Sequence, residues 1–544
     1  MTLIKKGSIM EQRDNLLPVK IVDYSKVENA ERLLYQGEGE QLDCTATYGV
    51  SFRASSWSEF QGKGSYIILD FGRELCGGIR MIVRSCVNTT RWRLTFGESL
   101  TEVCSSIGEK NATNDHSPRD FEIITSNMSD LEYGQTGFRF VRMELLDEDW
   151  ATVQYIMAVS ILPFFETEAE ITTNDARLNE IIHTAAYTLK LCFQKGYIWD
   201  GIKRDRLVWG GDLHPEIITS LYLFGDTEYI CNSLRLVRDG TTLDRWVNDI
   251  PAYSAWWVIN LCDYCAFTGN HAFFEENRSY ALHILKKLDD CVSEDGVMTF
   301  DKAFGMDYFL DWPSNHHPEA VIGVAALICW MAQKYTAMEE NVNCNNLMQK
   351  LAPYLEKKAT LKNIRAFQIL AGKTPTEEDV QLLQTGGANG ISTFMSYYVL
   401  MAMAKAGGTD MLDITKEYYG GMLDRGATSF WEDFDIAWLE NSSRIDEFPK
   451  EGQRDIHADF GKYCYTQLRH SLCHGWSSGV LAFLIEYVFG IHITDGGRKL
   501  CVKPHLLGLT DVKMKFPMKQ GEVLITIHND KVDVEVPEGV VIEL

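Results

Sequence analysis

The chain has 544 residues, a length that suggests two to four domains. Its net charge of −24 gives an acidic surface that repels phosphate backbones, so nucleic acid is not expected as a partner. The 14 cysteines show no disulfide-framework spacing, the first ten residues lack the apolar stretch of a signal peptide, and no run of about 18 apolar residues is visible. We therefore expect a cytoplasmic protein with free thiols and no membrane span.

The N-terminal part of the chain has the pattern of short strands separated by turn-forming residues. Residues 1–168 are therefore predicted to form a β-sandwich. The segments that carry this pattern are Tyr66–Gly72, Gly78–Arg84, Arg91–Gly97 and Gly137–Glu144.

Helical periodicity begins after the capping cluster Thr172–Asp175, with apolar residues from Leu178 to Leu189 at helical spacing. About a dozen helical segments follow with little strand signal, which favours paired helices in a toroid. We predict an (α/α)6 barrel over residues 169–490. The clearest segments are 174–194, 253–267, 272–290, 318–336, 391–406 and 465–487.

The last part of the chain returns to strand-like alternation. Gly521–His528 and Lys531–Val536 flank an Asn-Asp turn and predict a hairpin. The predicted fold class is thus multidomain α+β, with the helical barrel flanked by the N-terminal β-sandwich and a small C-terminal β-domain at 491–544.

The densest polar cluster runs from Trp199 to Glu216. Its carboxylates, cations and tryptophans suit acid–base chemistry on a sugar, because Arg lowers the pKa of a neighbouring carboxyl while apolar walls raise that of another. The alternative is an ion-paired loop in which Asp212 caps the following helix. The candidate site residues in this segment are Asp200, Arg204, Asp205, Trp209 and Asp212.

A second cluster, Gly426–Asp435, interleaves acidic and aromatic residues. Burying a carboxylate among rings is costly without a compensating partner. Glu432 is therefore a candidate for the second carboxylate of a glycosidase pair, and an exposed acidic turn is the alternative.

Further candidates are a histidine and three tryptophans. His474 precedes a helical segment and can donate to a sugar hydroxyl, although a core histidine is the alternative. Trp256, Trp257 and Trp312 can line a sugar pocket or fill the core. His316-His317 lacks carboxylates at ligand spacing, and no phosphate-binding loop is present, so we expect neither a metal nor a cofactor.

Together these clusters resemble bacterial α-L-rhamnosidases of glycoside hydrolase family 78. The family's acidic motif, Asp-Cys-Pro-x-Arg-Glu-Arg-x-Gly-Trp-x-Gly-Asp, is similar to Asp200–Asp212, and its Gly-Ala-Thr-x-x-Trp-Glu is matched by Gly426–Glu432. Its Asn-His-Tyr stretch loosely resembles Cys473–Gly475. Asp70–Gly72 and Gly137–Phe140 match its β-domain motifs. The family's Glu is Asp205 here, one methylene shorter.

The resemblance implies an inverting hydrolase that releases L-rhamnose from small glycosides, with Asp205 as general acid and Glu432 as general base. It further implies that Asp200, Arg204, Asp212 and His474 hold the sugar, and that Trp209, Trp312 and one of Trp256 and Trp257 wall the pocket. A homodimer is an additional expectation. Two alternatives stay open: another (α/α)6 glycosidase or phosphorylase, and a sugar-binding protein without turnover.

Overall fold

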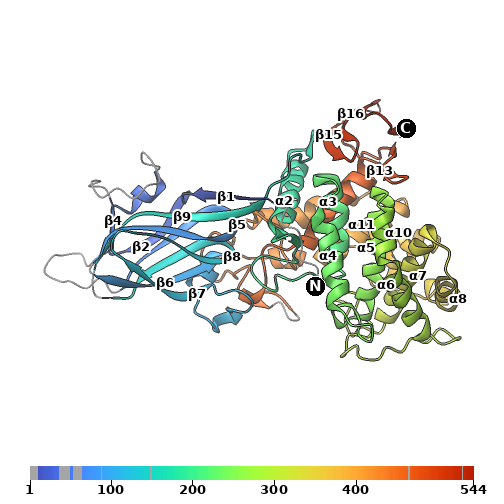
Figure 1. Ribbon diagram of the computed structural model, residues 1–544, viewed down its shortest axis with the longest axis horizontal. Helices are drawn as coiled ribbons and strands as arrows, with labels where there is room; N and C mark the ends of the chain where they lie inside the picture. The colour runs from blue at the N-terminus through green and yellow to red at the C-terminus, as the bar shows by residue number, and fades with distance from the viewer. Residues whose placement is uncertain are drawn as a thin grey trace.

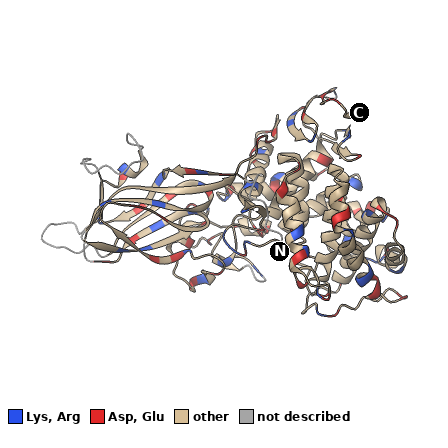
Figure 2. Cartoon of the chain, in the orientation of Figure 1, with Lys and Arg blue, Asp and Glu red and all other residues tan. Residues whose placement is uncertain are grey.

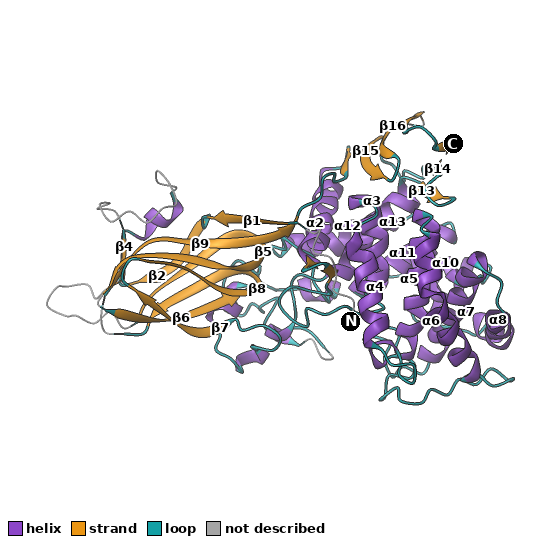
Figure 3. Cartoon of the chain, viewed as in Figure 1, coloured by secondary structure: helices purple, strands orange, loops and turns teal. Residues whose placement is uncertain are grey.

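The computed structural model describes residues 10–35, 49–52, 64–86, 88–147, 150–462, 466–529 and 531–544. Its N-terminal strands extend from one side of a helical body, and the C-terminal strands lie on that body beside α3 and α13 (Figures 1 and 3). Acidic and basic positions are interspersed over both parts (Figure 2). The N-terminal residues that carry the signal-peptide prediction, 1–9, lie outside the described part.

The N-terminal strands form one antiparallel sheet of nine strands. Its long strand β5 pairs with β8 along most of its length, with β2 at its start and with β9 at its end. The strands are β1 (Glu11–Leu16), β2 (Lys20–Ser25), β3 (Val27–Glu28), β4 (Val50–Phe52), β5 (Ser65–Cys86), β6 (Thr89–Gly97), β7 (Asp120–Ser126), β8 (Ser129–Leu145) and β9 (Ala151–Pro163). Short helices η1 (Ala30–Leu34), α1 (Leu100–Cys104) and η2 (Glu109–Asn111) accompany them.

The sheet encloses its own apolar core. Buried side chains from β3 to β9 form one cluster, in which Phe52 packs edge-on against Trp92 with ring centroids 4.9 Å apart. Burial alternates over the first residues of β6 and β9, and the rest of each strand is buried almost continuously. The expected two layers of a sandwich are thus joined through the long strands into a single hydrogen-bonded sheet.

Six helices of the second part contact one another in a closed cycle, α3–α5–α7–α9–α11–α13 and back to α3. The other helices pack outside it, as α6 does on α5 and α8 on α7. Bounds are α2 (Ala176–Cys192), α3 (Leu213–Phe224), α4 (Glu228–Gly240), α5 (Pro251–Thr268), α6 (His271–Asp290), α7 (Ala320–Met338), α8 (Val342–Leu355), α9 (Lys362–Leu370), α10 (Glu377–Gln384), α11 (Thr393–Lys405), α12 (Met411–Asp424) and α13 (Gly479–Phe483). Single turns are η3 (Val247–Asp249), η4 (Ile436–Leu439), η5 (Gln467–Arg469), η6 (Gly475–Ser478) and the π-turn η7 (Leu484–Val488).

Local signals explain several helix ends. Asp175 caps α2 by accepting a hydrogen bond from Leu178 N, as the capping cluster predicts. Pro251 begins α5, and Gly269 ends it in the left-handed conformation. The helix predicted over 465–487 is wrong in its first part. Residue 465 lies outside the described ranges, and 470–474 is irregular, with Ser471 N and Leu472 N donating to the carboxylates of Glu432 and Glu98.

The C-terminal strands form two small sheets. The predicted hairpin is present as β16 (Gly521–His528) paired with β17 (Lys531–Glu535). β15 (Asp511–Met518) joins it and also pairs with β10 (Glu170–Thr173), so the chain at 170–173 belongs to this sheet. The second sheet contains β13 (Ile491–Thr494), β14 (Lys499–Val502) and β18 (Val541–Glu543), and β11 (Phe193–Gln194) pairs with β12 (Tyr197–Ile198) near the site.

Among the described residues one helix, α7, is long and apolar enough to cross a membrane. Two thirds of its apolar window is buried inside the protein, as in a core helix. The twelve cysteines of the described ranges are free thiols, in agreement with the expectation from their spacing.

Candidate active site

The turn between β12 and α3 carries the first acidic cluster. Asp205 and Arg206 both have positive backbone φ angles, 54° and 57°, a left-handed conformation that is uncommon for residues other than Gly. Two contacts of Arg206 stabilise this strained turn. Its guanidinium donates to the carbonyl of Gln135 in β8 and stacks on Trp199. The β-sheet part thus fixes the turn that presents Asp205.

A cavity of about 240 Å³ opens beside this turn. Six of the ten predicted site residues line it: Asp200, Asp205, Trp209, Asp212, Trp312 and His474. The remaining wall is mostly apolar and comes from the loops before α5 and α7, as well as from η6. These further lining residues are Asn248, Asp249, Ile250, Tyr253, Ala303, Phe304, Met306, Phe309 and Trp476.

Two of the lining carboxyls, Asp200 and Asp212, are almost fully buried. Burial, reinforced by neighbouring carboxylates, raises the pKa of each well above its ordinary value. Tyr253 OH donates to Asp212 at 3.1 Å, and a Cβ at Gly211 would lie 2.5 Å from the Tyr253 ring. Glycine at 211 therefore allows the tyrosine to reach Asp212.

Arg204 joins the two carboxylates proposed to react. Its Nη1 donates to Asp205 Oδ1 at 2.9 Å, and its Nη2 donates to Glu432 Oε1. Two hydrogen bonds of about 3 Å plus the width of one guanidinium keep those oxygens within roughly 8 Å of each other. This upper limit is compatible with the separation of paired carboxyl groups in glycosidases, which is about 5–9.5 Å.

Glu432 lies just behind the cavity wall, fully buried. Ser471 N donates to its second oxygen at 3.1 Å, and Trp476 donates from its indole to the Glu432 carbonyl. His474 Nε2 is 3.5 Å from the carboxylate, and burial lowers the pKa of His474 well below its ordinary value. A neutral imidazole thus separates Glu432 from the cavity and is shared with Asp200 and Asp212, each 3.9 Å away.

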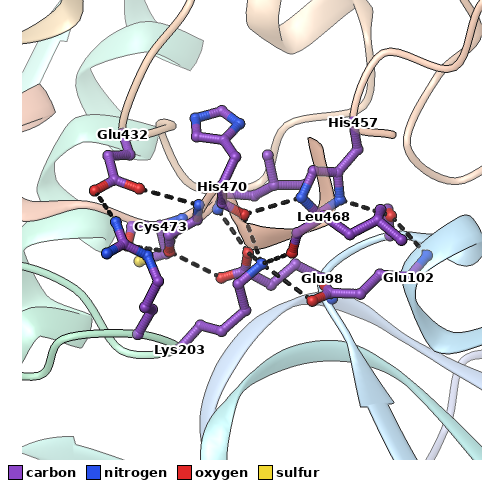
Figure 4. Close-up of polar contacts among 12 residues, drawn as sticks. Glu98, Glu102, Lys203, Glu432, His457, Leu468, His470 and Cys473 are labelled. Atoms are coloured by element: carbon purple, nitrogen blue, oxygen red, sulfur yellow. Dashed lines mark hydrogen bonds and ion pairs between the residues drawn. The ribbon is translucent and has the colours of Figure 1, made fainter. Parts of the chain in front are cut away.

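A buried network links this centre to the β-sheet part (Figure 4). Lys203, next to Arg204, points between Glu98 and Glu102 at 3.0 and 3.1 Å and donates to the carbonyls of Leu468 and His470. Glu98 also accepts from Leu472 N at 2.6 Å. The segment that carries Arg204 and the segment that binds Glu432 are thereby held on the same carboxylate.

Glu98, Glu102 and His457 are close enough to hold a metal ion, a group that the search for ligand spacing in the sequence missed. However, Lys203 and Arg119 already supply two positive charges to the two carboxylates. Both ring nitrogens of His457 are also engaged, Nδ1 with Ser99 Oγ and Nε2 with the His470 carbonyl. The donor set therefore suits an ammonium better than a divalent cation.

The structure does not bring Trp256 and Trp257 to the cavity, so their place in the predicted pocket wall is wrong. Both are fully buried on α5: Trp256 packs on His214 and Tyr398, while Trp257 packs on Tyr280. The cavity is instead reached by Tyr253, one turn earlier on the same helix. The alternative role of Asp212 as a helix cap is not seen either, because its side chain makes no capping bond.

Sequence reasoning also missed Trp476, Tyr253 and His116. Trp476 and Tyr253 lie in segments predicted to be helical. Whether either side chain faces the cavity depends on how its helix is rotated about its axis. His116 lies in a loop of the β-sheet part, 3.2 Å from Asp205. No local pattern connects this loop with the acidic turn.

No protein-family model matches the chain. No curated protein matches it either. Solved structures do match. A family 78 rhamnosidase of Bacillus sp. GL1 is 20% identical with a TM-score of 0.67 over 88% of this chain and 53% of its own. A Klebsiella oxytoca rhamnosidase with rhamnose bound is 19% identical with a TM-score of 0.66 over 88% of this chain and 96% of its own.

A native α-L-rhamnosidase from Aspergillus terreus is 14% identical, with a TM-score of 0.65 over 88% of this chain and 59% of its own. The chain thus spans about half the length of the Bacillus enzyme but nearly all of the Klebsiella one. Its multidomain α+β fold is thus similar to that of solved glycoside hydrolases. More narrowly, it is similar to the fold of these rhamnosidases, one of which is described as a member of family 78.

Proposed function

We propose that this protein is an inverting α-L-rhamnosidase that releases terminal L-rhamnose from small glycosides. The observation that carries the proposal is the cavity itself. In a rhamnosidase fold it gathers Asp200, Asp205 and Asp212 against tryptophan walls, with Glu432 one side chain behind. Paired carboxylates can hydrolyse a glycosidic bond, and apolar rings beside them can pack against the sugar.

Asp205 is the proposed general acid that protonates the leaving-group oxygen. Glu432 is the proposed general base that takes a proton from the attacking water. That water would reach Glu432 beside His474 Nε2, the group that separates the carboxylate from the cavity. Asp200, Asp212 and His474 would hold sugar hydroxyls, while Trp209 and Trp312 would pack against the ring.

The closed cycle of six helices supports an (α/α)6 barrel as the frame of this site. A cavity of about 240 Å³ favours one terminal sugar over a polymer segment. The mechanism needs no cofactor or metal. A cytoplasmic location, a homodimer and the absence of membrane or nucleic-acid partners stay predictions.

The phosphorylase alternative needs a cationic site for phosphate. Arg204 and Arg206 are the nearest candidates, but Arg204 is paired with two carboxylates and Arg206 is bound to Gln135 and Trp199. Both guanidiniums thus already bind protein groups, which disfavours either of them as a phosphate site.

Assay of 4-nitrophenyl α-L-rhamnoside, with and without inorganic phosphate, tests the proposal. We expect hydrolysis that does not depend on phosphate. Release of rhamnose 1-phosphate would instead identify a phosphorylase. Rhamnose binding by calorimetry without any turnover would identify a sugar-binding protein.

A further inference from the structure

The N-terminal β-sheet part places one titratable side chain directly on the proposed acid. His116 Nδ1 lies 3.2 Å from Asp205 Oδ1, the same oxygen that accepts from Arg204. The His116 side chain is 32% exposed and that of Asp205 is 12% exposed. The imidazole therefore bridges bulk water and the inner carboxyl.

The approach of the two side chains is fixed by a shared anchor. Ser117, next to His116, donates to the carbonyl of Gln135 at 2.6 Å, and Arg206, next to Asp205, donates to the same carbonyl at 3.1 Å. One peptide group of β8 therefore sets the spacing between the two turns. His116 itself has a φ of 67°, so its loop holds a strained conformation at the contact.

A general acid must hold a proton at the pH at which the enzyme works. Arg204 cannot supply that proton to Asp205, because a guanidinium stays protonated in proteins. The imidazole of His116 contacts the same carboxylate and is itself partly exposed to solvent. It therefore offers Asp205 a route by which a proton can arrive from bulk water.

We propose that His116 is a positioning residue of this active site, holding the proton that Asp205 delivers to the leaving group. The inference rests on the proposed glycosidase function. The imidazolium N–H proton passes to Asp205, which protonates the glycosidic oxygen as the anomeric C–O bond breaks. Water attacks the anomeric carbon and gives one proton to Glu432. Solvent then carries that proton back to His116, so that one water is consumed for each bond cleaved.

Charged groups face His116 from the acidic turn and from its own loop, and the Arg206 guanidinium shares the Gln135 carbonyl with the neighbouring Ser117. Asp205 and, through it, Arg204 face the imidazole from the acidic turn. Asp115 is its neighbour in the loop and lies 3.5 Å from Arg469 of η5, which offsets its charge. Asp205 is thus the carboxylate that the imidazole of His116 contacts.

The test compares His116→Gln with wild type on two substrates across pH. 4-Nitrophenyl α-L-rhamnoside has an activated leaving group that departs without full protonation, whereas methyl α-L-rhamnoside needs the acid. We expect kcat on the methyl glycoside to fall at least about tenfold at pH 7.5 with KM nearly unchanged, and the alkaline limb of its pH profile to move to lower pH. The nitrophenyl substrate should be cleaved at nearly the wild-type rate.

His271→Gln is the matched control, because His271 is an exposed histidine at the start of α6. Imidazole added to His116→Ala should restore turnover of the methyl glycoside, because the native imidazole borders solvent. Equal losses on both substrates would assign His116 a purely structural role and overturn the inference, as would an unchanged pH profile in an active enzyme. A wild-type protein inactive on both rhamnosides would overturn the proposed function and this inference with it.

Discussion

The ammonium of Lys203 lies 3.0 Å from the carboxylate of Glu98, deep between the β-sheet and the helical parts (Figure 4). Lys203 immediately precedes Arg204, and Glu98 binds the backbone of Leu472, which follows the Ser471 that holds Glu432. This ion pair is therefore the point at which both halves of the proposed catalytic pair are tied to the N-terminal sheet.

Lys203→Met should destabilise the fold strongly. Removing the lysine leaves two buried carboxylates short of one positive charge, a change that typically costs about 3–5 kcal/mol. Chemical denaturation at pH 7 measures the loss. Lys287→Met on α6, a half-exposed lysine, is the control, and an equal effect of the two substitutions would contradict the role given to Lys203.

Glu98→Gln should change how stability depends on pH. Burial raises the pKa of Glu98 from 4.5 to about 7, so between these values the folded protein binds more protons than the unfolded chain. The contribution of Glu98 to stability therefore falls as pH rises from about 4.5 to about 7. The melting temperature of Glu98→Gln relative to wild type should rise over that interval and level off above it. A difference that is constant with pH would show that Glu98 titrates normally.

Asp205→Asn and Glu432→Gln should each lower kcat at least about 100-fold, because each removes a positioned acid or base. Thermal melting should show that both variants stay folded, and Asp413→Asn on the exposed side of α12 is the control. If Asp205→Asn is nearly silent while Asp200→Asn is inactive, the roles within the acidic turn are exchanged. Asp200 would then be the acid, in line with its raised pKa.

The first sugar released should be β-L-rhamnose, the product of inversion from an α-L-rhamnoside. An inverting enzyme admits water between base and sugar, with carboxyl groups about 6.5–9.5 Å apart, whereas a retaining one needs about 5–5.5 Å. Proton NMR within the first minutes of reaction, before mutarotation, distinguishes the anomers. Initial release of the α-anomer would assign retention.

EDTA should leave activity unchanged, since the buried carboxylates Glu98 and Glu102 already have cationic partners. Rates are to be measured after dialysis against the chelator and after return of Mg²⁺, Ca²⁺ or Zn²⁺. Activity that is lost and then restored by one of these ions would reveal a metal site.

The two kinds of tryptophan should separate in mutagenesis. Trp209→Ala removes part of the cavity wall and should raise KM with little change in melting temperature. Trp257→Ala removes a fully buried ring and should cost about 3–5 kcal/mol of unfolding free energy while leaving KM of the folded enzyme intact. A raised KM in Trp257→Ala would return that residue to the sugar pocket.

The amino-acid pattern predicted where helices and strands lie better than it predicted which way their side chains point. The cap at Asp175, the hairpin at β16–β17 and most long helices follow from local periodicity and capping, which act over a few residues. Trp256 and Trp257 show the limit. Neighbouring positions on α5 differ by about 100° in direction, and a helix apolar on nearly every side gives no cue to which residue faces a cavity.

Contacts between distant segments were out of reach for the same reason. The acidic turn and Glu432 could be placed together because each has its own dense motif. Glu98 and His116 come from segments with no motif, and their contacts with Lys203 and Asp205 depend on how a sheet docks on a helical body. The helical prediction for 470–474 fails for the same reason, because nothing local shows that the N–H groups of Ser471 and Leu472 bind Glu432 and Glu98.

The carbonyl of Gln135, which binds both Ser117 and Arg206, bears on whether the β-sheet part can be separated from the helical part. A β-domain that merely accompanied a catalytic domain could be exchanged or deleted without changing the chemistry. Here one peptide group of β8 holds both the acidic turn and the histidine loop, while Glu98 holds the lysine beside Arg204. We therefore expect the smallest active unit to include the N-terminal sheet, and we expect substitutions in that sheet to move the proposed acid without any change in the cavity lining.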